Sequence, residues 1–407
     1  MKDSNDLVFK ATVFCWALIS PQKQGSFEDY LWSMGKEAQK RGWTYIVCVI
    51  EPISPTLKTW LLESGCELIC LDYDKITNSG FIVRLLKERK VDILHTHFIG
   101  PTDPSLLLCK LRWGGKIVFT DHSSNPLGMP SKDYLVLNQL RSMRQSILSL
   151  AIDAYLPVSD FVASRIARNL PNAHHKIHRL YNGIDLARFQ SAIPKEKAMQ
   201  IKSARLGVSD DIMIVAFIGQ LTQEKGIDHF LNVAKRCVDG GIECQFLIIG
   251  DGAYRKEVET LCAHQDYQRD IQYLGLRSDV PDILSVTDVF VMPSLWGEAF
   301  GLTAIEASAC GVPVVASNIG GLPEVILHHH SGILIEAGDE TGLYDAIWRL
   351  IEDTDARVEF GQKGRRHAEQ NFGLDNMVSK TFSHYQRLLN SNESLWESMK
   401  KMLELRG

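Results

Sequence analysis

The sequence lacks the features that would place a chain in a membrane or a secreted, disulfide-bonded class. No apolar run reaches the roughly 18 residues that a spanning helix requires, and the first ten residues, MKDSNDLVFK, lack the apolar core of a signal peptide. Nine cysteines, an odd number without Cys-x-x-Cys spacing, predict reduced, buried thiols. We therefore expect a cytoplasmic protein with no transmembrane segment, and peripheral contact with a membrane stays open.

The sequence also lacks the basic stripe of a nucleic-acid-binding protein. Residues 1–190 contain 23 Lys and Arg against 18 Asp and Glu, whereas the remaining residues contain 21 against 31. A net charge of −5 offers little to displace the counterions of a phosphate backbone, so we expect no nucleic-acid partner. The positive N-terminal half leaves room for an anionic ligand or membrane surface.

What the sequence does contain is a regular alternation of short β-branched runs with helical stretches. This alternation predicts parallel sheets with crossover helices. The runs occur in both halves, as TYIVCVI, VDILHTHF and KIVFTDHS and then as IMIVAFIGQL, CQFLIIGDG, DVFVMPS and VPVVAS. Because 407 residues are too many for one ordinary core, we expect an α/β protein with two doubly wound, Rossmann-like domains.

The boundary between the two domains is predicted near residue 190. The turn YNGID, at 181–185, and the polar stretch QSAIPKEKAMQ that follows have the composition of a connector. The predicted domains are an N-terminal domain over 1–190 and a C-terminal domain over 191–375. Helices over 376–407 complete the chain.

Three glycine-containing turns are the candidate ligand sites. In open α/β sheets, ligands bind beyond the carboxyl ends of the strands, where helix N-termini present free N–H groups to anions. The turns are QGSFEDY at 24–30, GQLTQEKG at 219–226 and EAFGLTAIE at 298–306. In the first turn we expect Ser26 to cap the helix that follows.

The third turn places two carboxylates around the start of a helix. After the strand DVFVMPS, the chain should pass Gly297 and Gly301 and begin a helix that ends near Gly311. Glu298 then precedes the helix, where an anionic side chain is favourable in any case.

Glu306 lies one turn into the same helix, where it can accept hydrogen bonds from a vicinal diol such as a ribose. A solvated helix face would explain Glu306 equally well. The turn itself can offer backbone N–H groups to a phosphate or sugar oxygen. The residues concerned are Ala299, Phe300, Gly301 and Leu302.

Together these motifs resemble the retaining glycosyltransferases of family 4, which have the GT-B fold. The resemblance rests on the Glu-x7-Glu spacing of Glu298 and Glu306 and covers nearly the whole chain. It also includes, in the expected order, HTHF, FTDHSSN, PVSDFV, YNGID, GQLTQEKG, IGDG, YLG and GGLPEVI. It implies that residues 1–190 form the acceptor-side domain, that residues 191–375 form the nucleotide-sugar-binding domain across a cleft from it, and that the first helix of 376–407 crosses back to the N-terminal domain. It also implies a nucleotide-diphosphate sugar as donor, no metal and no cofactor, and retention of the anomeric configuration.

The resemblance also implies roles for individual residues. Cleavage of a sugar–diphosphate bond develops negative charge on the leaving phosphate, and Lys225 is the cation expected there. His122 matches the histidine that approaches the donor sugar, and Glu298 should hold sugar hydroxyls, so both are predicted catalytic residues. The leaving phosphate, rather than His122, is the expected acceptor of the incoming hydroxyl's proton.

The match is less complete at Gln220 and at Gly25–Ser26, and Arg277 has two explanations. Gln220 stands where the family usually has Arg, so one charge-assisted contact to the diphosphate is missing. Gly25 and Ser26 stand where two glycines are common, although Gly25 still permits close backbone approach. Arg277 follows YLGL, where it would contact the nucleotide base or phosphate, and an ordinary surface arginine explains it almost as well.

The histidines of the first half allow a second interpretation. His95 and His97 share one face of a strand, because strand side chains alternate with period two. With Asp121 and His122 they would suit a metal ion, yet we expect no metal site and place His97 instead on the acceptor side, with Asn125.

The leading prediction is a hexosyltransferase that uses a UDP-sugar slightly in preference to a GDP-sugar and acts on a small-molecule, glycan or lipid-linked acceptor. A sugar phosphorylase or nucleotide-sugar epimerase on the same fold is one alternative, and Gln220 keeps it open. A catalytically silent sugar-nucleotide-binding subunit is the other, although the presence of Glu298, Glu306, Lys225 and His122 weighs against it.

Overall fold

The structure, a computed structural model, describes residues 10–22, 24–123, 144–189 and 193–391. These residues form two compact units. Unit 1 contains the described residues up to Gly183 together with those from Leu374 onward, and unit 2 contains those from Ile184 to Gly373. The chain thus passes between units a few residues before the boundaries expected near residues 190 and 375.

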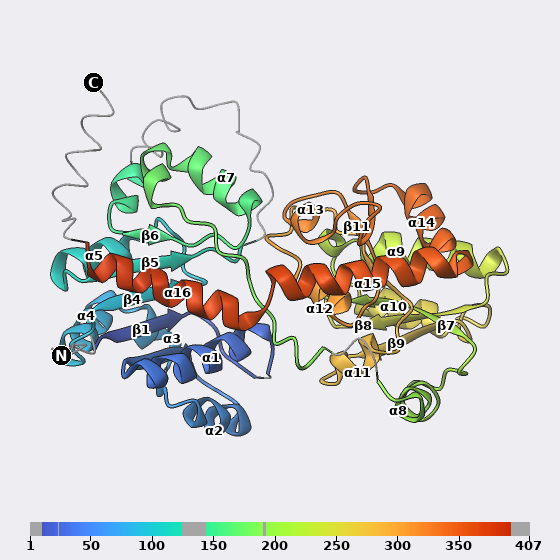
Figure 1. The fold of residues 1–407 in the computed structure, drawn as a ribbon, viewed down its shortest axis with the longest axis horizontal. Helices are drawn as coiled ribbons and strands as arrows, with labels where there is room; N and C mark the ends of the chain where they lie inside the picture. The colour runs from blue at the N-terminus through green and yellow to red at the C-terminus, as the bar shows by residue number, and fades with distance from the viewer. Residues whose placement is uncertain (1–9, 23, 124–143, 190–192, 392–407) are drawn as a thin grey trace, which may run out of the picture. The chain divides into compact units, whose positions relative to one another are not determined.

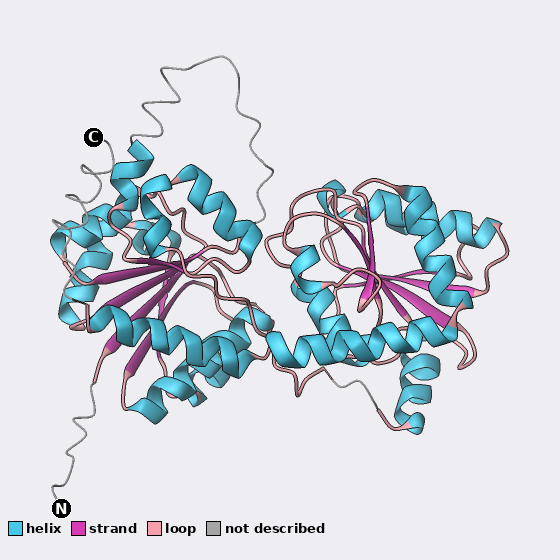
Figure 2. Ribbon diagram, turned by 45° about the horizontal axis from the view of Figure 1, so that its top comes forward, coloured by secondary structure: helices cyan, strands magenta, loops and turns pink. Residues whose placement is uncertain are grey.

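Unit 1 is built on a six-stranded parallel sheet with the strand order β3-β2-β1-β4-β5-β6. Its strands are β1 (Thr12–Ala17), β2 (Thr44–Ile50), β3 (Glu67–Leu71), β4 (Ile93–His97), β5 (Lys116–Thr120) and β6 (Ala154–Tyr155). Its helices are α1 (Ser26–Arg41), α2 (Pro55–Glu63), α3 (Tyr73–Thr77), α4 (Ser79–Glu88), α5 (Pro104–Arg112), α7 (Asp160–Asn169), the 3₁₀ segment η1 (Pro171–Lys176) and α16 (Leu374–Leu389). Figure 2 shows helices on both faces of the sheet, which explains why β1 and β2 are buried over most of their length.

The strand order of unit 1 reverses between β1 and β4, which lie side by side but are far apart in sequence. At such a switch point the connections leave the sheet toward opposite faces and open a crevice at the carboxyl ends of the two strands. The loops after β1 and β4 are therefore the part of unit 1 where a ligand is expected.

The helix α16 belongs to unit 1 although it lies near the end of the sequence (Figure 1). It packs against α1 and buries Met377, Val378, Phe382 and Tyr385 in the same core as the first strands. Residues 392–407, the remainder of the predicted C-terminal helices, lie outside the described residues.

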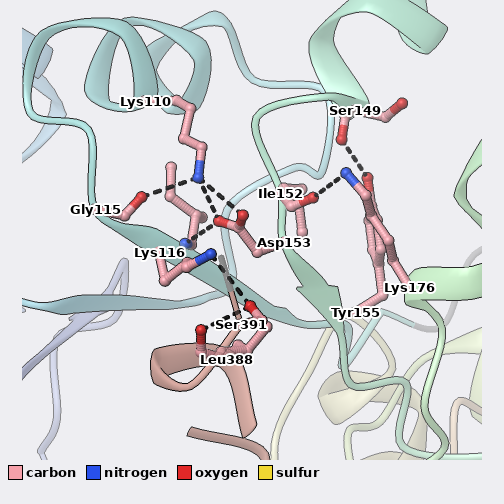
Figure 3. A network of polar contacts seen from close by, with 11 residues as sticks. Lys110, Gly115, Lys116, Ser149, Ile152, Asp153, Tyr155, Lys176, Leu388 and Ser391 are labelled. Atoms are coloured by element: carbon pink, nitrogen blue, oxygen red, sulfur yellow. Dashed lines mark hydrogen bonds and ion pairs between the residues drawn. The ribbon is translucent and has the colours of Figure 1, made fainter. Parts of the chain in front are cut away.

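A buried ion pair links α5 to the segment that precedes β6 (Figure 3). Lys110 of α5 is 7% exposed, and its Nζ lies 2.6 Å from Oδ2 of Asp153, which precedes β6. The same carboxylate accepts a hydrogen bond from the backbone N–H of Ile117 at 2.7 Å. Because each charge has further polar partners, the cost of desolvating the pair is offset within the unit.

Unit 2 contains a second six-stranded parallel sheet, with the strand order β12-β11-β10-β7-β8-β9. Its strands are β7 (Met213–Ile218), β8 (Cys244–Ile249), β9 (Ile271–Gly275), β10 (Val289–Met292), β11 (Val314–Ser317) and β12 (Gly332–Ile335). Its helical segments are α8 (Lys195–Gln200), the π-helical η2 (Ile201–Leu206), the 3₁₀ segment η3 (Gln223–Lys225), α9 (Ile227–Asp239), α10 (Arg255–Cys262), α11 (Val280–Leu284), α12 (Leu302–Ala309), α13 (Leu322–Val325), α14 (Glu340–Glu352) and α15 (Thr354–Asn371). The prediction of two doubly wound α/β units is confirmed.

Within the described part of the chain, none of the helices combines the length and the apolar composition needed to cross a bilayer.

The cap of α1 differs from the expected one. The backbone is still extended at Gly25, whose carbonyl accepts the first helical hydrogen bond from Asp29 N–H at 2.9 Å. Gly25 is therefore the N-cap residue and Ser26 the first residue of the helix. The expectation that Ser26 is the cap is wrong, and Glu28 instead accepts a hydrogen bond from the Gly25 N–H at 3.0 Å.

Candidate active site

The candidate residues of unit 2 lie on loops that follow neighbouring strands. The loop after β7 contains GQLTQEKG, the loop after β10 contains Glu298, and the loop after β11 contains Gly320 and Gly321. Since β7 pairs with β10 and β10 pairs with β11, all three loops leave the same edge of the sheet. The fold thereby brings together turns that are far apart in the sequence.

An ion pair joins the first two of these loops. Lys225 Nζ lies 2.5 Å from Glu298 Oε1, and Ser294 Oγ donates a hydrogen bond to the same oxygen at 2.8 Å. Glu298 is 6% exposed, whereas the Lys225 side chain is about a quarter exposed. The predicted diphosphate cation and the predicted sugar-binding carboxylate are therefore direct partners, and Ser294, which is not among the predicted residues, contacts the same carboxylate.

Close backbone contacts hold the same loops in place. Leu295 N–H donates to Glu224 C=O at 2.9 Å, and Gly321 N–H donates to Glu298 C=O at 2.8 Å. A Cβ at Gly226 would lie 1.9 Å from the carbonyl oxygen of Pro293, and Gly226 also has a φ of 68°, which favours glycine. Side-chain-free backbone at this point is therefore what allows the loops after β7 and β10 to touch.

The helix α12 begins as the sequence predicts. Gly301 is its N-cap with a φ of 100°, the helix runs over Leu302–Ala309, and Gly311 follows in the left-handed region with a φ of 76°. Ala299 is 6% exposed and Phe300 is 2% exposed, and the Phe300 ring packs edge to face on Phe372. Backbone groups, rather than these side chains, are what the turn can offer a ligand.

Three other candidates of this unit differ in their surroundings. Gln220 is exposed on the loop after β7, and Glu306 is partly buried on α12. Arg277 instead makes two parallel contacts with Asp279, from Nε to Oδ1 at 2.8 Å and from Nη2 to Oδ2 at 2.6 Å. These contacts raise the pKa of Arg277 and lower the pKa of Asp279, so the guanidinium is already engaged within its own loop.

In unit 1, two candidate histidines meet at the carboxyl ends of adjacent strands. His97 ends β4 and is fully buried, and His122 follows β5 and is half-buried. Their ring nitrogens, His97 Nδ1 and His122 Nε2, are 3.0 Å apart. The structure thus brings together two histidines that the sequence places near each other in the sheet, and it shows that their rings are in direct contact.

Desolvation makes both rings difficult to protonate. It lowers the pKa of His122 to about 4, although the negative charge of Asp121 opposes this shift. Burial likewise holds the pKa of His97 well below its usual range. Asp121 is itself paired with Arg165 at 2.9 Å, so its charge is shared. At neutral pH the two histidines are therefore uncharged.

His95 has a different environment from His97, although the two rings share one face of β4 as predicted and lie 4.1 Å apart. Its Nδ1 lies 2.6 Å from Tyr385 Oη and its Nε2 lies 2.7 Å from Thr120 Oγ1. Burial lowers its pKa to about 3. With both nitrogens occupied, His95 is a satisfied core residue that links β4 to α16.

Two phenylalanine rings that were not among the predicted residues pack beside the histidine pair. Phe27, at the start of α1, lies 5.1 Å from the His97 ring and 5.7 Å from the His122 ring, measured between centroids. Phe98 stacks on His122 at 4.9 Å. No sequence signal marks Phe27, because its contact with the histidines depends on the packing of α1 over the sheet.

Two further candidate residues come from the N-terminal half of the sequence. The backbone N–H of Gly25, which was expected to face the nucleotide-sugar donor, already donates a hydrogen bond to the Glu28 carboxylate. An incoming anion would have to replace this carboxylate. Asn125, predicted on the acceptor side, lies outside the described residues. Among the residues that are described, no three His, Cys, Asp or Glu side chains are grouped so as to hold a metal ion.

Two family profiles match the chain. The one described as Glycosyltransferase Family 4 matches residues 28–188, and the one described as Glycosyl transferases group 1 matches residues 199–367. Each profile therefore lies largely on one unit of the structure.

Known proteins show the same relationship. Alpha-maltose-1-phosphate synthase of Mycolicibacterium smegmatis is 30% identical over 297 residues, which are 69% of this chain and 75% of that protein. The GDP-mannose-dependent monoacylated alpha-(1-6)-phosphatidylinositol monomannoside mannosyltransferase of Corynebacterium glutamicum is 26% identical over 314 residues, which are 74% of this chain and 78% of that protein.

Solved structures share the fold. A glycosyltransferase from Rickettsia africae has a TM-score of 0.78 at 23% identity, over 94% of this chain and 100% of its own. Anabaena HepE in complex with UDP and glucose has a TM-score of 0.73 at 18% identity, over 93% of this chain and 100% of its own. With the sequence matches, these likenesses confirm the predicted family: the chain belongs to the family 4, group 1 glycosyltransferases, and it is a glycosyltransferase of the GT-B fold.

Proposed function

We propose that this enzyme transfers a hexosyl group from a nucleotide-diphosphate sugar to an acceptor hydroxyl with retention of the anomeric configuration. Membership of family 4 supports the reaction type. Relatives that carry GDP-mannose or UDP in their names support the donor class, with a UDP-sugar slightly favoured. The acceptor is a small molecule, a glycan or a lipid-linked acceptor.

The observation that carries the proposal is the convergence of Lys225, Ser294 and Glu298 at the edge of the unit 2 sheet. A leaving diphosphate needs a cation and fixed hydrogen-bond donors, and Lys225 with the backbone at the start of α12 supplies both. Glu298 is buried enough to keep its position and has a second oxygen with which to accept a sugar hydroxyl. Charge neutralisation and sugar orientation are thus assigned to adjacent groups.

The remaining donor residues have supporting roles in this proposal. Glu306 accepts hydrogen bonds from the ribose diol, and Gln220 donates a neutral hydrogen bond to the diphosphate. Arg277 reaches the nucleotide only by giving up part of its pairing with Asp279, so its contribution is the smallest of the set. Gly25 offers its N–H to an anion in exchange for the Glu28 carboxylate.

On unit 1, His122 is the proposed contact of the transferred sugar. Because its ring is uncharged at neutral pH, it offers a directed hydrogen bond rather than a positive charge. The leaving phosphate then remains the group that accepts the proton of the incoming hydroxyl.

A cytoplasmic location is part of the proposal. All nine cysteines are free, and burial raises the pKa of thiols such as Cys15, to about 12, and Cys109. Unreactive reduced thiols of this kind are typical of proteins from a reducing compartment.

The test is a thermal-shift panel of UDP, GDP and ADP with their glucose and mannose derivatives. A ligand present at 100 times its dissociation constant should stabilise the native protein by about 2.7 kcal/mol. The sugar nucleotide with the largest shift is then incubated with the enzyme, and proton NMR follows release of the nucleoside diphosphate and the configuration of the freed sugar. An inverted product, or the absence of any shift across the panel, would contradict the proposal.

A further inference from the structure

The contact between His97 and His122 restricts where each ring can carry its proton. The two nitrogens that meet are His97 Nδ1 and His122 Nε2, at 3.0 Å, and the rings lie nearly parallel, with 27° between their planes. Since both rings are uncharged, one N–H must lie between these nitrogens. The nitrogen of His122 that remains for a substrate is therefore Nδ1.

Only two arrangements of protons satisfy this contact. Either both rings carry their proton on Nδ1, and His97 donates to His122, or both carry it on Nε2, and His122 donates to His97. The two cases present opposite chemistry to a substrate. In the first His122 offers an N–H donor, and in the second it offers a lone pair that could act as a base.

The surroundings of His97 distinguish the two arrangements. His97 Nε2 is buried and has no hydrogen-bond partner among the described residues. The second arrangement would leave an N–H in this position, whereas the first leaves a lone pair. A buried N–H without a partner is the rarer of the two in proteins, so the first arrangement is favoured.

The neighbours of His97 prevent it from turning. Phe27 and Tyr30, both on α1, meet its ring edge to face at 5.1 and 5.7 Å. His95 packs on it at 4.1 Å and is itself held by Tyr385 of α16. His122 is half-buried and borders Phe98 as well as Phe27, so the rigid ring of the pair is His97.

The charged and titratable groups around the pair leave this arrangement intact. Asp121 precedes His122, but it accepts hydrogen bonds from Arg165 and from Ser123, at 2.9 Å in each case. His95 faces His97 and is uncharged. Tyr30 keeps its phenolic proton, because burial raises its pKa far above the usual value.

We propose that His97 is a positioning residue that fixes the ring and the tautomer of His122, so that His122 presents Nδ1–H to the substrate as a hydrogen-bond donor. The proposal rests on the proposed glycosyl transfer and deepens it. A donor N–H suits an oxygen of the sugar or of the leaving phosphate, and it rules out His122 as the base. This agrees with the phosphate being the proton acceptor.

Nitrogen-15 NMR of the protein labelled at histidine tests the tautomer directly. The His122 signals are assigned by their loss in His122→Gln. In the wild-type enzyme at pH 7, Nδ1 of His122 should have the shift of a protonated nitrogen and Nε2 that of an unprotonated one. A proton on Nε2, or a single averaged shift for both nitrogens, would overturn the proposal. This test needs only the wild-type enzyme and no variant of His97.

Variants of His97 test its role. His97→Phe keeps a planar ring without the hydrogen bond, and the two shifts of His122 should then move toward an average. His97→Asn places an amide N–H near the original Nδ1 and should restore the wild-type pattern. His95→Phe is the matched control, since it removes a buried imidazole from the same face of the same strand, and it should leave the His122 tautomer unchanged. Melting curves show which variants are folded.

Kinetics with UDP-glucose then separate positioning from general damage. His97→Phe should lower kcat for donor cleavage about ten- to a hundredfold with little change in KM. This fall in kcat is smaller than that expected from loss of a whole catalytic group, and His97→Asn should restore most of the lost kcat. In a His122→Ala background, His97→Phe should have no further effect, because it acts through His122. An equal loss in both backgrounds would contradict the proposal.

Failure of the proposed function would have a different appearance. If no sugar nucleotide binds or is cleaved, the transferase proposal fails, while the NMR pattern of His122 still shows whether His97 fixes the tautomer. If donor cleavage is normal but His97→Phe changes neither the tautomer nor kcat, only the positioning role is lost.

Discussion

Substitution of Lys225 by alanine should destabilise unit 2 before any ligand is considered. Glu298 is 6% exposed, and loss of Lys225 leaves its Oε1 with the hydroxyl of Ser294. Breaking a buried pair by removing one partner costs about 3–5 kcal/mol, but the Lys225 side chain is 26% exposed and water screens part of the interaction. We expect a loss of about 1–3 kcal/mol in the free energy of unfolding.

The opposite substitution, Glu298→Gln, should cost less. Glutamine keeps an oxygen for the Ser294 hydroxyl and leaves no buried charge, and the freed Lys225 ammonium can turn toward water. We expect a loss below about 1 kcal/mol, as for a partly exposed pair. The double variant Lys225→Ala/Glu298→Gln should therefore be more stable than Lys225→Ala alone, which is the opposite of what independent effects would give.

Thermal unfolding of the three variants and the wild type, without nucleotide, measures this asymmetry. A loss of about 2 kcal/mol corresponds to a fall of about 4–8 °C in Tm for a unit of this size. If Glu298→Gln is as damaging as Lys225→Ala, or if the double variant shows the sum of both losses, the ion pair does not carry the energy assigned to it.

Titration of the same variants with UDP tests the assigned roles. Lys225→Ala should weaken binding by about 1.5–3 kcal/mol, the range for a charged hydrogen bond. Glu298→Gln should bind UDP at least as tightly as the wild type, because the ammonium no longer has to leave a carboxylate, yet turnover should fall with loss of the sugar contact. Equal losses of UDP affinity in both variants would show that the roles are wrongly divided.

Three further predictions concern other parts of the chain. In urea unfolding, Gly226→Ala should destabilise unit 2 by more than about 3 kcal/mol because the new Cβ would overlap the carbonyl of Pro293. The control is Gly241→Ala, which should cost only about 1–2 kcal/mol, because Gly241 also has a positive φ, of 75°, but has open space around it among the described residues. Because burial lowers the pKa of His95 from about 6.5 to about 3, the unfolded chain takes up protons first as pH falls. The resulting stability is complete above pH 6.5 and is lost below it at up to about 1.4 kcal/mol per pH unit, so His95→Gln should flatten the fall in Tm between pH 7 and pH 5. Gln220→Arg should tighten UDP binding by a margin that shrinks as salt rises, and unchanged or weaker binding would show that this position does not face the diphosphate.

The sequence by itself determined the class of fold, the start of α12 and the family. Alternating β-branched and helical stretches are typical of parallel sheets with crossover helices. Gly301 and Gly311 mark the ends of α12 because few other residues adopt their backbone angles. The order of the motifs over both halves identified the family, because so many short patterns in one order rarely occur by chance.

Which of two neighbouring residues caps a helix was harder to predict. Ser26 and Gly25 both suit a cap, and the choice depends on where the backbone leaves its extended conformation, which here is at Gly25. In the same way, Arg277 looks like a nucleotide contact in the sequence, but in the structure its guanidinium pairs with the carboxylate two residues away.

Only the tertiary structure decided which candidate residues are partners. Lys225 and Glu298 are 73 residues apart in sequence and His97 and His122 are 25 apart, and each pair meets because it follows two strands that lie side by side in a sheet. Strand order is set by how the helices cover both faces of the sheet, which is a property of the whole unit and not of any segment. The burial that leaves the histidines uncharged and the carboxylate dependent on its lysine comes from the same packing.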